Sequence, residues 1–200
     1  MTQLFFDNCR RANGGIGANY TTVAGGPGGF NIASNKATPS IISNDCWSAL
    51  TAIAFPANHY SRFTFSTVGV ANASNHGCGP SVRTTPGGVS GNGYITTLGD
   101  VSGTELLYRP NANGVGDVLL ASSGSLTWAN GDSAMLSVVG SLLVLWKLAS
   151  GSSSWVPVLS ATDTNLTGGG PGVFYSSTAT TLATLISLAF GDISSTPPIA

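Results

Sequence analysis

The stretch Asn130–Leu148 constrains the fold of this chain more than any other. It contains two apolar runs, Ala134–Val139 and Leu142–Leu148, which are joined only by Gly140 and Ser141. A glycine at the first position of a two-residue connection supplies the positive φ of a type II′ turn, so the stretch is predicted to be a β-hairpin. Because side chains alternate along a strand, both faces of the second run are largely apolar. We therefore expect the hairpin to lie inside a two-layer β structure.

A membrane span is the competing interpretation of the same apolar runs. Ser137, Gly140 and Ser141 interrupt them, and Lys147 ends them before they reach the roughly 20 residues that a transmembrane helix needs. The chain also has no polybasic segment that would bind an anionic membrane surface. We expect no membrane insertion.

The shortage of charged residues indicates an all-β protein. Only 8% of the 200 residues are charged, against about 25% in an average globular protein. Surface helices would require more Glu and Lys than Glu105, Lys36 and Lys147 supply. The net charge is −1, and the basic residues do not cluster beyond Arg10 and Arg11, so nucleic-acid binding is not expected. A surface so poor in charge resists self-association weakly, which favours a protein that belongs to an assembly.

The cysteines and the first residues bear on the compartment. Cys9, Cys46 and Cys78 are odd in number and widely spaced, which does not match the disulfide framework of a small secreted protein. We expect three buried free thiols, with one disulfide as the open alternative. The sequence begins without a basic segment followed by an apolar one, so no signal peptide is predicted and synthesis in a host cytoplasm is expected.

Many short apolar segments set off by Gly or Pro predict a two-sheet antiparallel β-sandwich of the jelly-roll kind. The longer ones are Trp47–Phe55, His59–Val68 and Leu182–Phe190, whereas Asn72–Pro80 is expected to be a polar loop. No shift in composition divides the chain, so residues 1–193 are predicted to form a single domain. Residues 194–200, which include two prolines, are expected to be an extended tail that docks on a neighbour.

Several stretches resemble one known family. The opening Phe6–Thr21 and its continuation Phe30–Asn35 are similar to the start of bacterial and phage concanavalin A-like (laminin G-like) domains. The stretch Gly131–Val144, followed by Asp163 and then by Gly170–Gly172, resembles the hairpin and the later loop of the same family. The resemblance spans most of the chain and implies a concanavalin A-like jelly roll.

The resemblance carries further implications for particular segments. It implies a tight loop at Arg11–Gly17 and a closing strand Ile186–Phe190 beside the first strand. Relatives hold a structural calcium ion in many cases, which makes the carboxylates of Asp7, Asp163 and Asp192 candidate calcium ligands here. The chain departs from the family at Cys9, where Phe is usual, at Tyr20, where Trp is usual, and in a closing strand that lacks acidic residues.

Catalysis is not predicted. A glycoside hydrolase needs two suitably spaced carboxylates, and the aspartates of this chain stand at predicted turns, where Asp is common for backbone hydrogen bonding. Of the two histidines, His59 begins a strand and His76 lies in a loop near Cys78. No acid-bearing motif frames a Cys–His pair, and two ligands are too few for a zinc site. We expect a protein that is not an enzyme and needs no cofactor beyond a structural calcium ion.

Sugar binding is the remaining chemistry. It requires an aromatic ring that stacks on a pyranose, with donors and acceptors around it. The candidates, all on predicted strands, are Arg83, Tyr94, Tyr108, Arg109 and Trp128. The alternative for each of these residues is an ordinary role in packing.

The function favoured by these observations is a non-enzymatic structural or adhesion component of a larger assembly. Family context points to a bacteriophage virion, either as capsid decoration or on the tail, where the partners would be other virion proteins, copies of itself and host-surface glycans. A stand-alone carbohydrate-binding lectin module is the main alternative. A polysaccharide hydrolase that depends on Glu105 is the weaker one.

Overall fold

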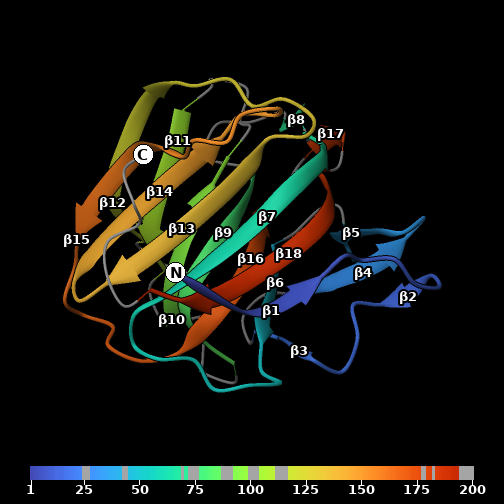
Figure 1. Ribbon diagram of the computed structural model, residues 1–200, viewed down its shortest axis with the longest axis horizontal. Helices are drawn as coiled ribbons and strands as arrows, with labels where there is room; N and C mark the ends of the chain where they lie inside the picture. The colour runs from blue at the N-terminus through green and yellow to red at the C-terminus, as the bar shows by residue number, and fades with distance from the viewer. Residues whose placement is uncertain are drawn as a thin grey trace.

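The protein is a sandwich of two antiparallel β-sheets (Figure 1). The computed structural model describes residues 1–23, 28–41, 45–68, 70–71, 77–86, 92–98, 104–110, 117–176, 179–181 and 183–193. Within these ranges no residue is helical, and no helix has the length and hydropathy that a membrane crossing requires. The predicted tail at residues 194–200 and the predicted loop residues Asn72–His76 lie outside the described residues.

The first sheet contains nine of the described strands. In spatial order they are β15 (Val156–Thr162), β14 (Leu142–Leu148), β13 (Ser133–Val139), β7 (His59–Thr67), β18 (Thr184–Asp192), β5 (Lys36–Pro39), β4 (Phe30–Ala33) and β2 (Gly14–Gly15), with β1 (Thr2–Asp7) paired to β18. The strand β1 runs antiparallel to β18, so Thr2 lies opposite Asp192 and Asp7 opposite Leu188. The first and the closing strand are therefore neighbours, as the family resemblance implies.

The second sheet contains seven described strands and packs behind the first in Figure 1. Their order is β12 (Val118–Ser125), β11 (Thr104–Arg109), β10 (Asn92–Thr97), β9 (Gly77–Thr85), β16 (Gly170–Ser176), β6 (Cys46–Leu50) and β3 (Tyr20–Thr22). A short pair, β8 (Val70–Ala71) and β17 (Ala179–Thr181), stands apart from both sheets.

The predicted hairpin is confirmed as β13 and β14, paired in register from Ser133 opposite Leu148 to Val139 opposite Leu142. Gly140 has a φ of 57° and Ser141 does not have a positive φ, as a type II′ turn requires. Leu143 and Leu145 are fully buried between the sheets. The opposite face of the hairpin is covered in part by a smaller cluster of Tyr60, Met135, Trp146 and Ile193.

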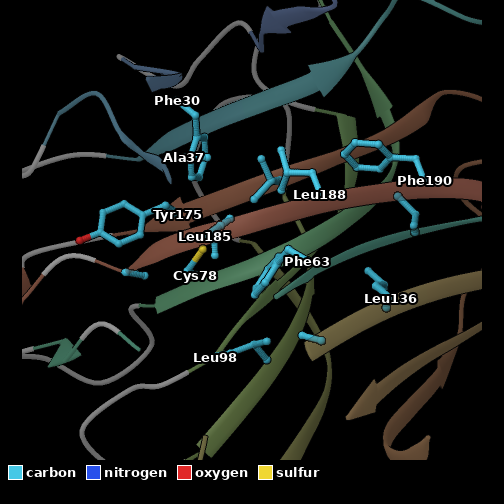
Figure 2. Packing of buried hydrophobic residues seen from close by; sticks show 14 of the residues in the cluster. Phe30, Ala37, Phe63, Cys78, Leu98, Leu136, Tyr175, Leu185, Leu188 and Phe190 are labelled. Carbon is cyan, nitrogen blue, oxygen red and sulfur yellow. The ribbon is translucent and has the colours of Figure 1, made fainter. Parts of the chain in front are cut away.

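The main core lies between the sheets and draws side chains from both (Figure 2). Phe63 from β7 and Leu188 and Phe190 from β18 face Cys78 from β9 and Tyr175 from β16. A direct link between the layers is the hydroxyl of Ser61, which donates to the carbonyl oxygen of Gly172 at 2.5 Å. The two sheets therefore share one hydrophobic core.

Two strand predictions were wrong in extent. Gly77–Pro80 belongs to β9 rather than to a loop. Gly77 and Gly79 let β9 approach its neighbour closely, since a Cβ on either would meet the backbone of Leu98 or Thr96. The Gly and Pro content of this segment suggests a loop instead. The opposite error concerns the predicted strand Trp47–Phe55, which is shorter than expected and ends at Leu50. Pro56 follows closely and cannot donate to a strand ladder, which fits an irregular segment there.

Candidate functional site

Asp7 is the centre of a buried structural contact. Both of its carboxylate oxygens accept from the Arg11 guanidinium, at 2.6 and 3.0 Å, and the Tyr20 hydroxyl and the Cys9 backbone N–H also donate to them. Burial by itself would raise the pKa of Asp7, but the Arg11 guanidinium and the Cys9 N–H outweigh it and hold this pKa below its ordinary value. The guanidinium also donates to the carbonyl of Ile16, which fixes the loop predicted at Arg11–Gly17.

Asp163 is the centre of a second network. Its carboxylate accepts from the Tyr94 hydroxyl at 2.8 Å, from the Arg109 Nε at 3.2 Å and from the backbone and side-chain amides of Asn165. The Tyr94 hydroxyl in turn accepts from the backbone N–H of Leu166. Although burial raises the pKa of Asp163, these donors lower it below the ordinary value. The network fixes the connection between β15 and β16.

Arg83 also holds loops in place. Its guanidinium donates to the carbonyl oxygens of Leu166, Gly140 and Ala57, which belong to three separate connections. The residue is 4% exposed and has a positive φ of 51°. Its backbone N–H donates to Nε2 of His59 at 3.1 Å. The side chain is therefore committed to the loops at one end of the sandwich.

Trp128 and Glu105 form a buried pair. The indole Nε1–H of Trp128 donates to a carboxylate oxygen of Glu105 at 2.7 Å, and Ser123 donates to the other oxygen. The ammonium group of Lys147 lies 5.1 Å from the centre of the indole ring. Glu105 is fully buried and holds Trp128 in place. A hydrolase that uses Glu105 on a solvent-exposed cleft does not fit this arrangement.

The predicted site residues are therefore not gathered on one sugar-binding surface. Arg83, Tyr94 and Trp128 are buried, at 4%, 0% and 7% exposure, because their strands direct them between the sheets or under loops. Arg109 pairs with Asp163. Only Tyr108 lies on the outer face of its sheet, where it packs against Ile95 and Phe174.

The calcium candidates do not form one ligand set either. Asp7 and Asp192 lie at opposite ends of the ladder between β1 and β18, and Asp163 follows β15 at the far edge of the same sheet. The oxygens of Asp7 and Asp163 already accept from Arg, Tyr and amide donors. Within the described residues, no three His, Cys, Asp or Glu side chains gather as a metal site would require.

The cysteines and the buried histidine are structural. Cys9, Cys46 and Cys78 are buried free thiols, as predicted. Burial, with the Asp7 carboxylate nearby, raises the pKa of Cys9 to about 11, which makes the thiol a poor nucleophile. His59 accepts from Arg83 at one nitrogen and bonds to the Pro56 carbonyl at the other, at 2.8 Å. His76 lies outside the described residues.

A different surface has the features of a binding site. The outer face of the second sheet has its own apolar cluster of Val23, Trp47, Ala49, Ile95 and Phe174, separate from the core. Trp47 and Phe174 pack edge to face with ring centres 5.7 Å apart, and the Trp47 indole donates to the Ser81 hydroxyl at 3.0 Å. An antiparallel sheet usually turns a polar face to water, but these five side chains are at most 5% exposed, so this outer face is largely covered.

Beside that cluster lies a hollow of about 260 Å³. Its lining residues are Asp45, Ile95, Thr97, Tyr108, Asp117, Phe174 and Ser176, and we refer to it as the acidic hollow. The apolar lining comes from the middle of β10, β11 and β16, and the two exposed aspartates come from the segments before β6 and β12. Aromatic surface and carboxylate acceptors thus meet in one place.

Thr97 adds a second sign of a ligand. The residue is 2% exposed and lines the acidic hollow, yet its hydroxyl has no hydrogen-bond partner among the described residues. A buried polar group without a partner destabilises the fold by about 1–3 kcal/mol.

Sequence reasoning identified one residue of this hollow, Tyr108. The sequence predicts turn positions for Asp45 and Asp117, and it does not single out Phe174. One signal was available: the segment Cys46–Leu50 is apolar or small at every position, and the structure buries all five residues. A strand apolar on both faces in an antiparallel sheet indicates that its outer face is covered or used.

Comparison with known proteins gives likenesses of structure but not of sequence. Neither a family model nor a curated protein matches the sequence. The fold is similar to the exoplasmic/lumenal domain of VIP36 in its Ca²⁺/Man-bound form, with a TM-score of 0.62 and 13% identity over 90% of this chain and 86% of that one. It is also similar to the carbohydrate-binding module CBM66 from Bacillus subtilis, with a TM-score of 0.58 and 14% identity over 87% and 92%.

A glycoside hydrolase gives a partial likeness. The GH43 protein BlXynB from Bacillus licheniformis, as a K247S mutant, aligns with 94% of this chain at a TM-score of 0.63 and 9% identity, but only 39% of that protein is covered. These likenesses confirm the predicted fold: the chain is a jelly-roll β-sandwich similar to concanavalin A-like and galectin-like folds.

Proposed function

We propose that the protein is a non-enzymatic carbohydrate-binding module and that the acidic hollow holds a sugar ring. The observation that carries this proposal is the combination, in one hollow, of half-buried Tyr108, exposed Asp45 and Asp117, and a Thr97 hydroxyl that has no partner in the part of the chain that the structure describes. A pyranose offers an apolar face for the aromatic ring and hydroxyls for the carboxylates. The solved structures that share this fold include a Man-bound form and a carbohydrate-binding module, which supports the proposal.

The charge and size of the hollow narrow the ligand class. Two carboxylates on the rim would repel a uronic or sialic acid, so the ligand is a neutral or amino sugar. Ligand pockets usually begin at about 300 Å³, and a volume of about 260 Å³ fits one ring rather than a long chain. The fully buried Glu105 offers no carboxylate to a surface-bound substrate, which supports binding without catalysis.

Titration of the purified protein with neutral, amino and acidic oligosaccharides tests the proposal. Tyr108→Ala is expected to weaken binding of the best neutral or amino ligand at least tenfold, which corresponds to about 1.4 kcal/mol. Tyr108→Phe keeps the ring and should retain most of the affinity. Asp117→Asn should weaken binding, whereas the matched charge removal Asp192→Asn, on the other sheet, should not.

Two outcomes would reject the proposal. If Tyr108→Ala binds as well as the unmodified protein, the acidic hollow is not the site. If the protein releases reducing ends from a polysaccharide and Asp45→Asn or Asp117→Asn abolishes that release, the acidic hollow is a hydrolase site and the non-enzymatic proposal is wrong.

A structural role in an assembly is the second candidate, and the sheet edges favour it. The strands β12 and β15 end the two sheets, and Val118, Leu119 and Val156 on them are exposed by 36%, 51% and 56%. Unpaired apolar edges are templates for pairing with another chain. These edges support self-association, which is one part of the assembly hypothesis. The full hypothesis also places the protein in a virion and gives it host-surface glycans as targets.

Sedimentation over a range of concentrations tests this second candidate. The unmodified protein is expected to form dimers or larger species, and the double change Leu119→Lys and Val156→Lys should return it to monomers, because charge on an edge strand blocks pairing. Leu142→Lys, at another exposed position of the first sheet, serves as the control and should leave association unchanged. A protein that stays monomeric at all concentrations would rule out self-association through these edges.

A further inference from the structure

A second hollow, of about 620 Å³, lies on the outer face of the first sheet, opposite the acidic hollow. Arg10, Lys36, Phe6 and Ile186 line it, and we refer to it as the basic hollow. Polar side chains from two loops and β18 complete the lining: Asn8, Ser34, Asn35 and Ser187. Its volume falls within the roughly 300–1,000 Å³ of small-molecule sites.

The basic hollow gathers the cations that the fold does not use. The chain has seven Lys and Arg residues. Arg11, Arg109 and Lys147 form ion pairs, Arg83 donates to loop carbonyls, and Arg62 lies over the Trp155 ring. Within the described part of the chain, the side chains of the remaining two, Arg10 and Lys36, have no ion pair or hydrogen bond, and both line this hollow.

An exposed aromatic ring lies beside these two cations. Phe6 is 53% exposed and Ile186 is 41% exposed, although alternate residues of the same strands face the core. Leaving a large apolar side chain exposed to water is unfavourable. Apolar surface next to unpaired positive charge therefore indicates a ligand that has a flat face for the Phe6 ring and an anionic group for the two cations.

The rim of the basic hollow is held rigidly. Ser34 and Asn35 form the two-residue turn between β4 and β5, with positive φ angles of 51° and 61°. This backbone conformation favours glycine, so having Ser34 and Asn35 at these positions lowers the stability of the fold. The Asn13 side chain accepts from the Ser34 backbone N–H at 2.9 Å, which fixes the turn. The hydroxyl and amide of the turn are thus preorganised on the rim.

We propose that the basic hollow is a second ligand site, specific for a carboxylate-bearing saccharide such as a uronic acid. Arg10 and Lys36 would bind the carboxylate, because a charge-assisted hydrogen bond is about twice as strong as a neutral one. The Phe6 ring would stack on the sugar, and the amides and hydroxyls of the rim would bind its hydroxyls. Six of the eight lining residues are polar or charged, and their donors and acceptors suit the hydroxyls of a saccharide. This inference does not depend on the acidic hollow binding sugar.

Titration with an oligogalacturonate and with its fully methyl-esterified form tests this inference, because esterification removes the charge of each carboxyl group and adds only a methyl group. The free acid is expected to bind, more weakly as salt is added, and the ester to bind at least tenfold more weakly. The double change Arg10→Ala and Lys36→Ala should remove the binding of the acid. Arg62→Ala, which deletes a cation outside the hollow, is the control and should not. Tyr108→Ala and Asp117→Asn should also leave acid binding unchanged, which separates this site from the acidic hollow.

Three results would overturn the proposal. Equal binding of the acid and the ester would show that charge is not recognised. An equal loss of binding in Arg62→Ala would indicate attraction to overall charge rather than a site. Tighter binding of an oligoglutamate peptide than of the oligogalacturonate, lost in the Arg10 and Lys36 double variant, would assign the hollow to an acidic protein partner.

Discussion

The ionisable residues of this chain are used mainly to fix loops. Arg11 and Asp7 hold the first loop, Arg109 and Asp163 hold the connection before β16, and the Lys147 ammonium lies 3.1 Å from an Asp132 oxygen at the entry to the hairpin. Because this chain has so few charged residues, charged turns alone do not keep the protein soluble. The expectation that the aspartates stand at turns is correct for Asp132 and Asp163 but wrong for Asp7 and Asp192, which are the last residues of β1 and β18. Side-chain partners far apart in the sequence could not have been predicted from the sequence.

His59 should make the stability of the protein depend on pH. Burial lowers its pKa from 6.5 to about 4, so between those values the unfolded state binds a proton that the folded state does not. Acid therefore favours unfolding, and we expect the free energy of unfolding to fall as the pH decreases from about 6.5 to about 4, by up to about 3 kcal/mol. Urea unfolding at a series of pH values measures this change.

The variant His59→Gln is the control for that experiment. Its amide can donate to the Pro56 carbonyl and accept from Arg83 but does not titrate in this range. The stability of this variant should change much less between those pH values. An unchanged slope would show that another group causes the pH dependence. Asp7, Asp132 and Asp163 have lowered pKa values, so their contribution is lost only at pH values below the ordinary aspartate range.

At the scale of strands, the sequence predicts what depends on near neighbours. The hairpin of β13 and β14 follows from alternation and from a glycine at the turn, both of which are local properties. The start of β9 does not follow from local properties, because Gly77, Gly79 and Pro80 are typical of loops. Whether they can form a strand depends on how closely they pack against β10. Which face of a strand is covered also depends on distant segments, so Tyr94 and Tyr108 could not be told apart as buried and half-buried.

The close approach of β9 and β10 predicts an unequal effect of two glycine substitutions. In Gly79→Ala the new methyl group would meet the backbone oxygen of Thr96, so we expect the unfolding free energy to fall by about 1–3 kcal/mol or more. In Gly124→Ala, on β12, nothing lies within 4 Å of the new methyl group. That variant should stay within about 0.5 kcal/mol of the unmodified protein. Urea unfolding of both variants measures the difference, and equal losses would contradict the proposed close packing of β9 on β10.

For the whole molecule, the fold could be predicted further than the site. Low charge and many short apolar segments indicate a β-sandwich, and the family resemblance supplies the pairing of the first and closing strands. The ligand surfaces form where strands from distant parts of the sequence lie side by side. Asp45, Thr97 and Asp117 come together only because β6, β10 and β12 belong to the same sheet. No spacing in the sequence reports that arrangement.

The ladder between β1 and β18 places the two ends of the sandwich against each other, with Thr2 opposite Asp192. A module whose ends meet can be inserted into a surface loop of a host protein without separating the two sides of that loop. Its hairpin turn at Gly140 and Ser141 lies far along the sequence from that junction. Grafted in this way, the sandwich would form a lobe whose backbone continued unbroken into the carrier.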